Sequence, residues 1–350
     1  MLLDDLLKSP GEWLGGAGPQ ADIVISGRVR MARNLAKYRF ISRMDTAERQ
    51  AVVDLVKSCL IARGVAPADR IFELQQVPKL DCKLLVERHL ISKEHEEAPH
   101  PRGVAIGDGE AVSVMFNEED HIRLQVLKSG MRLQETFVQA QGVDAKLDED
   151  LDFAFSADLG YLTACPTNVG TGMRVSVMLH LPALVITRHI EKVFQAVSKI
   201  NLAVRGLYGE GTEASGHFYQ ISNQVTLGKT EADIVANVEQ VIPTIVNYER
   251  KAREELLKKD RVRLEDRVWR AYGLLKHVRV MTSDESMMLL SAVRMGVHLG
   301  ILPGLDIGTV NELFLFSQPA HLQKLAGKAL EAHQRDIRRA EFIRGRLESN

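Results

Sequence analysis

The chain has few cysteines, few aromatic residues and almost no net charge. Its three cysteines among 350 residues are widely spaced and odd in number, which excludes a disulfide framework and offers no zinc-ligand spacing. A formal net charge of −1 excludes bulk attraction to nucleic acid or to a membrane surface. No hydrophobic run reaches the length of a membrane span, and the acidic start lacks the features of a signal peptide. We therefore expect a cytoplasmic protein with no metal site, no direct nucleic-acid partner and no membrane anchor.

The length and the polarity pattern predict two domains. A chain of 350 residues can bury a large core. Residues 1–21 are polar and rich in glycine toward their end, which indicates a loose lead-in. We expect a first domain over residues 22–255 and a helical second domain over residues 256–350, where apolar residues recur at helical spacing.

Hydrophobic periodicity predicts the following elements. Alternating apolar residues indicate strands at 22–29, 111–116, 122–126, 174–181, 202–206 and 218–227. Helical spacing indicates helices at 46–63, 80–89, 130–145 and 182–199, and from 230 onward. Residues 94–109 are rich in His, Pro, Gly and acidic residues, so we expect a loop there.

The most informative segment is Asn117-Glu118-Glu119-Asp120-His121-Ile122-Arg123. Three consecutive carboxylates follow the predicted strand 111–116, where a strand ends and functional residues often gather. A second segment, Cys165-Pro166-Thr167-Asn168-Val169-Gly170-Thr171-Gly172, is followed by Arg174. Together the two segments resemble the signatures of the phosphagen (guanidino) kinases, which transfer phosphate between ATP and a guanidinium nitrogen.

The chemistry of that family explains the residue types. A guanidinium is a poor nucleophile because it is protonated at neutral pH and its charge is delocalised. A fixed carboxylate orients the guanidinium and accepts a proton, and preorganised cations stabilise the transferring phosphoryl group. Arginine suits the second task because its planar donors match phosphate oxygens. Arg28 and Arg30 are two residues apart on an extended segment, so their side chains share one face.

The resemblance assigns roles to individual residues. Glu119 matches the catalytic carboxylate, Glu210 the second carboxylate that holds the guanidinium, and Cys165 the reactive cysteine, whose thiol we expect to be acidified. His89 matches a histidine placed against the adenine. The ATP- and phosphate-binding residues implied are Ser26, Gly27, Arg28, Val29, Arg30, His89, Arg123, Arg174, Val175, Ser176, Val177, Met178, Arg205, Gly206, Leu207, Tyr208 and Gly209. The implied cofactor is ATP with Mg²⁺ held mainly through phosphates and water.

Two competing motifs are weaker. Gly228-Lys229-Thr230 is similar to the end of a phosphate-binding P-loop, but Asn223 stands where the first glycine is needed. The histidines at 89, 95 and 100 have a spacing that fits no standard metal site.

Gly27 stands where serine is usual in the family, a departure that concerns local backbone contacts. Two larger departures bear on the substrate. Only about two dozen residues precede the Ser26-Gly27-Arg28-Val29-Arg30 segment, where creatine and arginine kinases carry a helical domain, and an additional helical region follows the catalytic part instead. This arrangement resembles the protein-arginine kinase (McsB) branch of the family, which implies an α+β fold: an antiparallel sheet flanked by helices, followed by a helical C-terminal domain. A small-molecule arginine kinase and a non-catalytic phosphoarginine-binding adaptor remain the alternatives.

The C-terminal region adds a further motif. Arg335-Asp336-x-x-Arg339-Ala340 matches a motif that forms an allosteric phosphoarginine-binding pocket in that branch. Residues 335 and 339 share a helix face, and arginines there suit a phosphate. The resemblance also implies substrate proteins bearing arginine, an activator protein (McsA), a heat-shock repressor (CtsR) and Clp protease as partners. It leaves a homodimer open.

Overall fold

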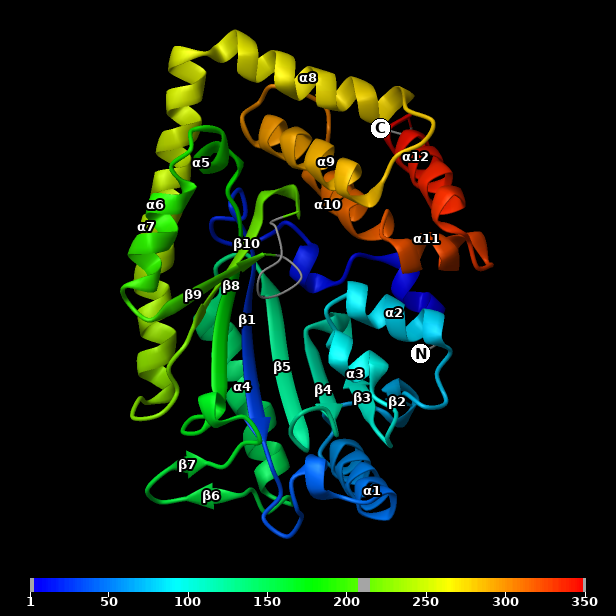
Figure 1. Ribbon diagram of the computed structural model, residues 1–350, viewed down its shortest axis with the longest axis vertical. Helices are drawn as coiled ribbons and strands as arrows, with labels where there is room; N and C mark the ends of the chain where they lie inside the picture. Colours follow the sequence, from blue (N-terminus) through cyan, green and yellow to red (C-terminus); the bar gives the residue numbers. More distant parts are fainter. Residues whose placement is uncertain (1–2, 207–214, 349–350) are drawn as a thin grey trace.

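The fold is built on an antiparallel sheet. The computed structural model describes residues 3–206 and 215–348. In this part of the chain, the main sheet has the strand order β2-β3-β4-β5-β1-β8-β10-β9 (Figure 1). These strands are β1 (Val24–Arg33), β2 (Ile71–Glu73), β3 (Gly103–Ile106), β4 (Val112–Phe116), β5 (Ile122–Ser129), β8 (Met173–His180), β9 (Leu202–Gly206) and β10 (Phe218–Asn223). A short hairpin, β6 (Phe155–Ser156) and β7 (Gly160–Tyr161), lies outside it.

Helices cover the sheet and form the C-terminal part. Figure 1 shows α8 to α12 gathered at one end of the sheet. The helices are α1 (Thr46–Ala62), α2 (Lys79–Glu87), α3 (Lys93–Glu97), α4 (Leu133–Asp148), α5 (Pro182–Ile186), α6 (Ile190–Ser198), α7 (Glu231–Lys259), α8 (Arg261–His277), α9 (Ser283–His298), α10 (Ile307–Phe316), α11 (Pro319–Ala326) and α12 (Ala332–Glu348). No described helix is long and apolar enough to cross a membrane.

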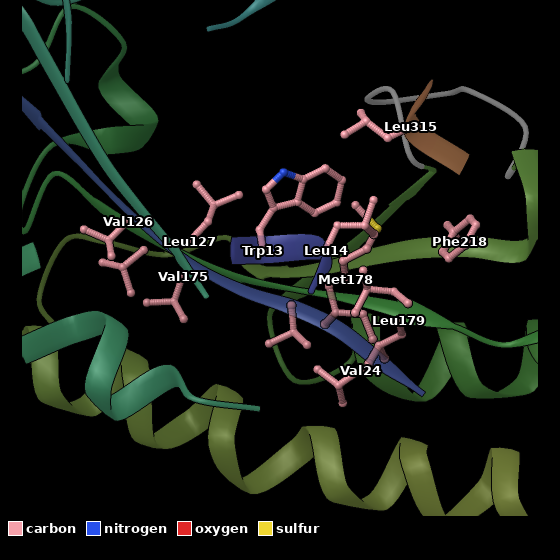
Figure 2. Close-up of a cluster of buried hydrophobic side chains, with 14 of the residues drawn as sticks. Trp13, Leu14, Val24, Val126, Leu127, Val175, Met178, Leu179, Phe218 and Leu315 are labelled. Carbon is pink, nitrogen blue, oxygen red and sulfur yellow. The ribbon is translucent and has the colours of Figure 1, made fainter. Parts of the chain in front are cut away.

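The predicted α+β class is confirmed, and three local predictions are wrong. The helix expected over 182–199 is two helices, because Arg188 adopts a φ of 57° between α5 and α6. The loop expected over 94–109 contains most of α3 and all of β3. The lead-in is packed rather than loose: Trp13 and Leu14 are buried among Leu127, Met178 and Leu315 (Figure 2).

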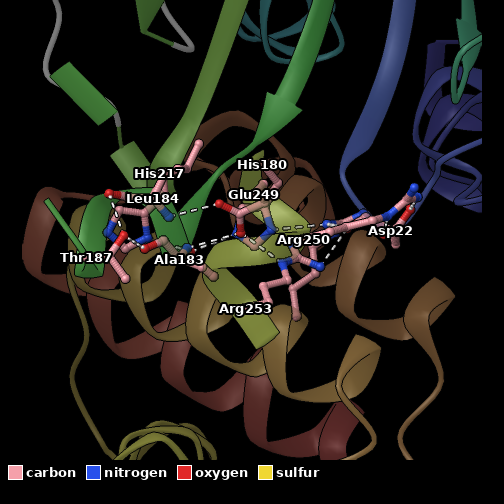
Figure 3. A network of polar contacts seen from close by, with 11 residues as sticks. Asp22, His180, Ala183, Leu184, Thr187, His217, Glu249, Arg250 and Arg253 are labelled. Atoms are coloured by element: carbon pink, nitrogen blue, oxygen red, sulfur yellow. Dashed lines mark hydrogen bonds and ion pairs between the residues drawn. The ribbon is translucent and has the colours of Figure 1, made fainter. Parts of the chain in front are cut away.

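A buried polar network joins α7 to the start of β1 and to α5 (Figure 3). Glu249 accepts hydrogen bonds from the backbone N–H groups of Ala183 and Leu184 at 3.1 and 2.9 Å, and from Arg253 Nε at 2.8 Å. Arg250 forms an ion pair with Asp22 at 2.8 Å. Helix α7 begins with a capping box at Thr230 and ends at Lys259, so the domain boundary that we place near residue 255 falls inside a continuous helix.

Candidate active site

Strand register places the five predicted phosphate-binding arginines on one face of the sheet. Arg28 and Arg30 alternate along β1, and Arg30 lies directly opposite Arg174 on β8. Gln125 on β5 lies opposite Arg30, and Arg123 is two residues from Gln125. The side chain of Arg123 therefore points to the same face of the sheet as that of Arg30. Arg205 on β9 pairs with Gln220, whose partner on β8 is Met178, again on this face. Residues far apart in the chain thus converge on one surface.

The opposite face of these strands is apolar. Val29, Val175 and Val177 are fully buried in the hydrophobic core. Their side chains therefore point away from the arginines and into the core, and a part for these three residues in ATP binding stays a prediction. Gly27 also faces this side: a Cβ there would lie 3.0 Å from a methyl group of Leu133 on α4, so a larger residue would press on the helix.

The arginine face forms the floor of a cavity of about 850 Å³. Predicted residues that line it are Ser26, Arg28, Arg30, His89, Glu119, Arg123, Cys165, Arg174, Ser176, Met178, Arg205 and Gly206. Further lining residues that sequence reasoning missed include Trp13, Ser92, Lys93, Glu94, Gln125 and Gln220. Ser92, Lys93 and Glu94 are consecutive at the start of α3, and the other three come from separate elements, so no shared motif identifies the set. The predicted residues Leu207, Tyr208, Gly209 and Glu210 lie outside the described residues.

The arginines repel one another in this confined space. Burial, together with the charges of Arg123, Arg174 and Arg205, lowers the pKa of Arg28 to about 10. Burial and the charges of neighbouring arginines hold the pKa of Arg30 well below its ordinary value, and its buried Nε has no hydrogen-bond partner among the described residues. Five arginines gathered on one face, with the pKa of Arg28 and Arg30 lowered, favour a polyanionic ligand.

Arg28 is nevertheless oriented by neutral partners. Its Nε donates to Ser176 Oγ at 3.3 Å, and its Nη2 donates to Gln220 Oε1 at 2.7 Å. Both partners lie on adjacent strands of the same face, so the guanidinium is held without being neutralised.

The acidic segment is a tight turn between β4 and β5. Asn117 adopts a φ of 58°, and its N–H donates to the carbonyl of His121 at 3.0 Å. Its side-chain amide donates to the carbonyls of Arg49 and Pro101 at 2.8 and 3.0 Å, which fixes the turn. The three carboxylates that follow therefore point in defined and different directions.

Glu118 is a buried partner of Arg123. Its side chain is 4% exposed and also accepts a hydrogen bond from Ser92 Oγ at 2.7 Å. Burial opposes ionisation, but the charge of Arg123 and the hydrogen bonds from Glu119 N–H, Ser92 and Arg123 outweigh it and lower the pKa of Glu118 to about 2. Glu118 is therefore an ionised positioning residue for Arg123.

Glu119 is the exposed carboxylate of the turn and faces the cavity. Burial against the cavity wall raises its pKa, and the charges of Asp120 and Glu118 add to this, while Arg123 and Arg174 oppose it. A carboxylate with a raised pKa is a better proton acceptor, which suits the role predicted for Glu119.

Asp120 and His121 have structural partners. Asp120 is 1% exposed and accepts hydrogen bonds from Asn34 Nδ2 at 2.6 Å and from the Ala164 N–H at 2.7 Å. His121 Nδ1 accepts from the Leu35 N–H at 3.0 Å, so its Nε2 donates to the Arg39 carbonyl. Asp120 thus holds the segment that carries Cys165 against the acidic turn.

Cys165 is the accessible thiol. It is partly exposed, and its Sγ lies 3.0 Å from Thr167 Oγ1. Cys59 and Cys82 are buried; burial raises the pKa of Cys59 to about 11 and also raises the pKa of Cys82. Among the three cysteines only Cys165 lines the cavity.

His89 and Trp13 form one wall of the cavity. Their rings are 4.9 Å apart in an edge-to-face arrangement. Burial and the nearby charge of Arg28 lower the pKa of His89 to about 4, so its ring is neutral at physiological pH. Trp13 Nε1 is buried and has no hydrogen-bond partner among the described residues. A flat neutral ring on this wall suits a nucleobase.

The segment 94–109 contributes a further part of the cavity lining. His95, Ala98 and His100 line the cavity, and Arg102 caps the end of α3 by donating to the carbonyls of His95, Glu96 and His100. Lys93, Glu94 and Glu119 are exposed at the rim. The rim thus contains carboxylates, whereas the floor contains arginines.

The C-terminal motif lies on α12, away from the cavity. Arg339 is 1% exposed and donates to the carbonyls of Ser317 and Met281, each at 2.9 Å, and to Asp336 at 2.6 Å. Ala340 is fully buried. Arg335 is partly exposed and donates to the Leu330 carbonyl at 2.7 Å. Arg339 therefore ties α12 to the preceding helices, whereas Arg335 remains accessible, and phosphoarginine binding by this motif stays a prediction.

Comparison with known proteins identifies the family. The model of the ATP:guanido phosphotransferase C-terminal catalytic domain matches residues 51–252, and that of the protein-arginine kinase McsB C-terminal domain matches residues 261–350. The chain is 47% identical over 348 residues to the protein-arginine kinase of Halothermothrix orenii, covering 99% of both chains. The chain belongs to the protein-arginine kinase family. It is also 44% identical to the protein-arginine kinase of Bacillus subtilis, covering 99% of this chain and 94% of that one.

Solved structures related to this protein-arginine kinase family member have the same fold. The duplicated taurocyamine kinase from Schistosoma mansoni, with bound transition-state-analogue components, is 27% identical with a TM-score of 0.60, covering 71% of this chain and 36% of that chain. Lombricine kinase, at 24% identity and a TM-score of 0.58, covers 68% of this chain and 69% of that one and shows the fold alone. The chain is thus a kinase of the phosphagen kinase family that uses ATP.

Proposed function

We propose that this enzyme transfers the γ-phosphate of ATP to the guanidinium nitrogen of arginine residues in proteins. The observation that carries the proposal is the five arginines on one sheet face beneath a rim with exposed carboxylates. The floor suits the triphosphate, and the rim suits an arginine side chain. The names of the relatives point to the same substrate class.

The reaction follows from this placement. Glu119 accepts a proton from the guanidinium, the freed nitrogen attacks the γ-phosphorus, and the bond to the β-phosphate oxygen breaks, giving ADP and phosphoarginine. Arg28, Arg30 and Arg174 stabilise the charge on the phosphoryl oxygens, while Glu118 fixes Arg123 beside them. Glu210, which lies outside the described residues, is assigned the role of second carboxylate by family resemblance alone, and Cys165 orients the guanidinium electrostatically without forming a covalent bond.

Magnesium is expected with ATP. Within residues 3–206 and 215–348, no group of three or more His, Cys, Asp or Glu side chains is arranged to hold a metal ion. Phosphate oxygens and water would therefore supply most of the ligands of Mg²⁺, as is common for phosphoryl-transfer enzymes. The ion would neutralise phosphate charge alongside the arginines.

The cellular role belongs to the same proposal. Phosphoarginine would mark proteins for Clp-type proteolysis and regulate a heat-shock repressor of the CtsR type, in the cytoplasm and with an activator such as McsA. Phosphoarginine binding at Arg335, Asp336, Arg339 and Ala340 would regulate the kinase, either as a monomer or as a homodimer. These roles and partners are proposed from family resemblance.

Substrate selectivity tests the proposal. The enzyme is incubated with labelled ATP and either an unfolded arginine-containing protein, free arginine or creatine. We expect label on the protein far in excess of label on the small molecules. Comparable turnover of free arginine would instead assign a small-molecule arginine kinase, and no transfer to any acceptor would favour a phosphoarginine-binding adaptor.

A further inference from the structure

Helix α11 of the C-terminal part contacts two carboxylates of α2, and one of them, Glu87, lies next to the cavity segment. Glu87, the last residue of α2, accepts hydrogen bonds from the N–H groups of Ala320 and His321 at 2.7 and 3.1 Å. Its second oxygen also lies 2.7 Å from His321 Nδ1. Glu87 thereby satisfies N–H groups that would otherwise be unpaired in the first turn of α11.

The neighbouring residue extends this attachment into the protein. Arg88 is fully buried, pairs with Glu110 through two hydrogen bonds, and donates from Nη1 to His321 Nε2 at 3.2 Å. Because Nε2 accepts, the His321 proton lies on Nδ1 and is donated to Glu87. Burial lowers the pKa of His321 despite the opposing effect of Glu87, in agreement with a neutral ring. His321 thus holds two consecutive residues, Glu87 and Arg88.

The third residue of the segment is His89, which lines the cavity. His89 adopts a φ of 59°, a conformation that its surroundings must maintain. Its carbonyl accepts a hydrogen bond from Gln125 Nε2 at 2.5 Å, and its ring contacts Trp13. No spacer separates the attachment to α11 from this strained residue, so a shift at Glu87 is transmitted directly to His89.

Helix α10 and Arg88, the residue after α2, hold the segment that carries Trp13. Asn311 on α10 donates to the Leu14 carbonyl at 3.1 Å, and Arg88 donates to the Ser9 carbonyl at 2.7 Å. Trp13 lies between these two anchor points in the chain. The Trp13 segment thus contacts α10 directly and α11 through Arg88, and His89 directly follows the two residues that contact α11.

We propose that the C-terminal domain positions the nucleobase-binding wall of the active site, with Glu87, His321 and Asn311 as positioning residues that set the affinity for ATP. The proposal rests on the proposed ATP site and extends it to regulation. Any ligand or partner that shifts α10 or α11 would change ATP affinity without contacting the nucleotide.

The chain offers a matched control at the same interface. Lys324 on α11 forms ion pairs with Asp81 at the start of α2 and with Asp4, each at 2.6 Å. This contact joins the same two helices at the end of α2 remote from His89. Lys324→Met therefore removes an interface ion pair and leaves the Glu87–His321 contact in place.

Tryptophan fluorescence gives a binding readout that is independent of phosphoryl transfer. The chain has two tryptophans, Trp13 in the cavity wall and Trp269 exposed on α8. In a Trp269→Phe background, emission reports Trp13 alone, and ATP titration gives the dissociation constant. Glu87→Gln, His321→Ala, His321→Asn, Asn311→Ala and Lys324→Met are compared in this background, with circular dichroism to verify folding.

We expect the dissociation constant for ATP to rise about tenfold in Glu87→Gln, His321→Ala and Asn311→Ala, the effect of losing one well-placed hydrogen bond. The amide of His321→Asn can still donate to Glu87, so its dissociation constant for ATP should rise less than that of His321→Ala. The dissociation constant of Lys324→Met should stay within about twofold of the parent value. Unchanged ATP affinity in the folded Glu87 and His321 variants would overturn the proposal, as would an equal loss in Lys324→Met. If the parent binds ATP but phosphorylates no protein, only the proposed function fails.

Discussion

Arg30 and Arg174 lie directly opposite each other on the adjacent strands β1 and β8. Like charges in this position destabilise a sheet, and Arg30 Nε is buried without a hydrogen-bond partner among the described residues. The charges of Arg28, Arg123 and Arg174 thus act against the charged form of Arg30, and a bound polyphosphate would offset this effect.

Arg30→Met should stabilise the nucleotide-free protein, whereas substitutions of buried residues usually destabilise a protein. Because it removes a poorly compensated charge, we expect the free energy of unfolding of the nucleotide-free protein to rise by about 1 kcal/mol. Stabilisation by ATP should be lost. Thermal unfolding with and without ATP measures both, and Arg43→Met, at an exposed arginine, should change neither. A destabilised free protein that still responds fully to ATP would show that Arg30 has a structural role only.

The adjacent carboxylates Glu118 and Glu119 should behave differently when changed to glutamine. Glu119→Gln should bind ATP nearly normally and lose about 10²-fold or more in phosphoryl transfer, because it removes the proton acceptor. Glu118→Gln should weaken ATP binding, because Arg123 loses its partner. Separate ATP-binding and single-turnover measurements distinguish the two. Glu210→Gln should resemble Glu119→Gln, and equal behaviour of Glu118 and Glu119 would contradict their assigned roles.

The ionisation of Glu118 should also make the free energy of unfolding depend on pH. Its pKa in the folded protein is about 2, below its ordinary value of 4.5. The folded state therefore binds the proton less readily than the unfolded state, so this contribution to stability is present above about pH 4.5 and is lost as the pH falls toward 2. The difference in free energy of unfolding between the parent and Glu118→Gln should shrink over this range in urea titrations. If this difference in free energy of unfolding did not change with pH, the ionised Glu118–Arg123 pair would not be its source.

Cys165 should be the first thiol to be alkylated. It is partly exposed in the cavity, whereas Cys59 and Cys82 are buried and burial raises their pKa. ATP with a protein substrate should protect Cys165, and Cys165→Ser should lower the rate without abolishing it. Peptide mapping after brief alkylation identifies the residue, and earlier modification of Cys59 or Cys82 would contradict this prediction.

Substitutions of the two arginines of the α12 motif should have different effects. Arg339→Ala should lower the free energy of unfolding by about 2–4 kcal/mol, because buried carbonyls of Ser317 and Met281 lose their donor. Arg335→Ala should leave stability within about 0.5 kcal/mol and abolish phosphoarginine binding outside the active site. Calorimetric titration with phosphoarginine tests this, and unchanged binding in Arg335→Ala would assign the motif a structural role.

Local patterns predicted the parts of the fold that depend on local chemistry. The alternation along β1 placed Arg28 and Arg30 on one face, and the apolar run before Asn117 identified β4. The break at Arg188 has no glycine or proline to mark it. Helix α3 depends on Arg102 donating to its last carbonyls, a contact that no periodicity reveals.

The same distinction applies to the site. Motif resemblance identified Glu119, Cys165 and the arginines, because each lies in a continuous segment. Trp13, Gln125 and Gln220 reach the cavity only through sheet register and packing, so sequence reasoning missed them. The matched segments also contain Val29, Val175 and Val177, whose side chains the strand alternation turns toward the core.

The central claim is transfer of phosphate to arginine in a protein. Its most direct test is incubation with labelled ATP and a generic unfolded protein, followed by assignment of the modified residues by mass spectrometry, with Glu119→Gln as the blank. We predict label that is labile in acid, stable in alkali and located on arginine, and almost none with Glu119→Gln. Acid-stable label on serine or threonine, or equal labelling by the Glu119 variant, would contradict the account.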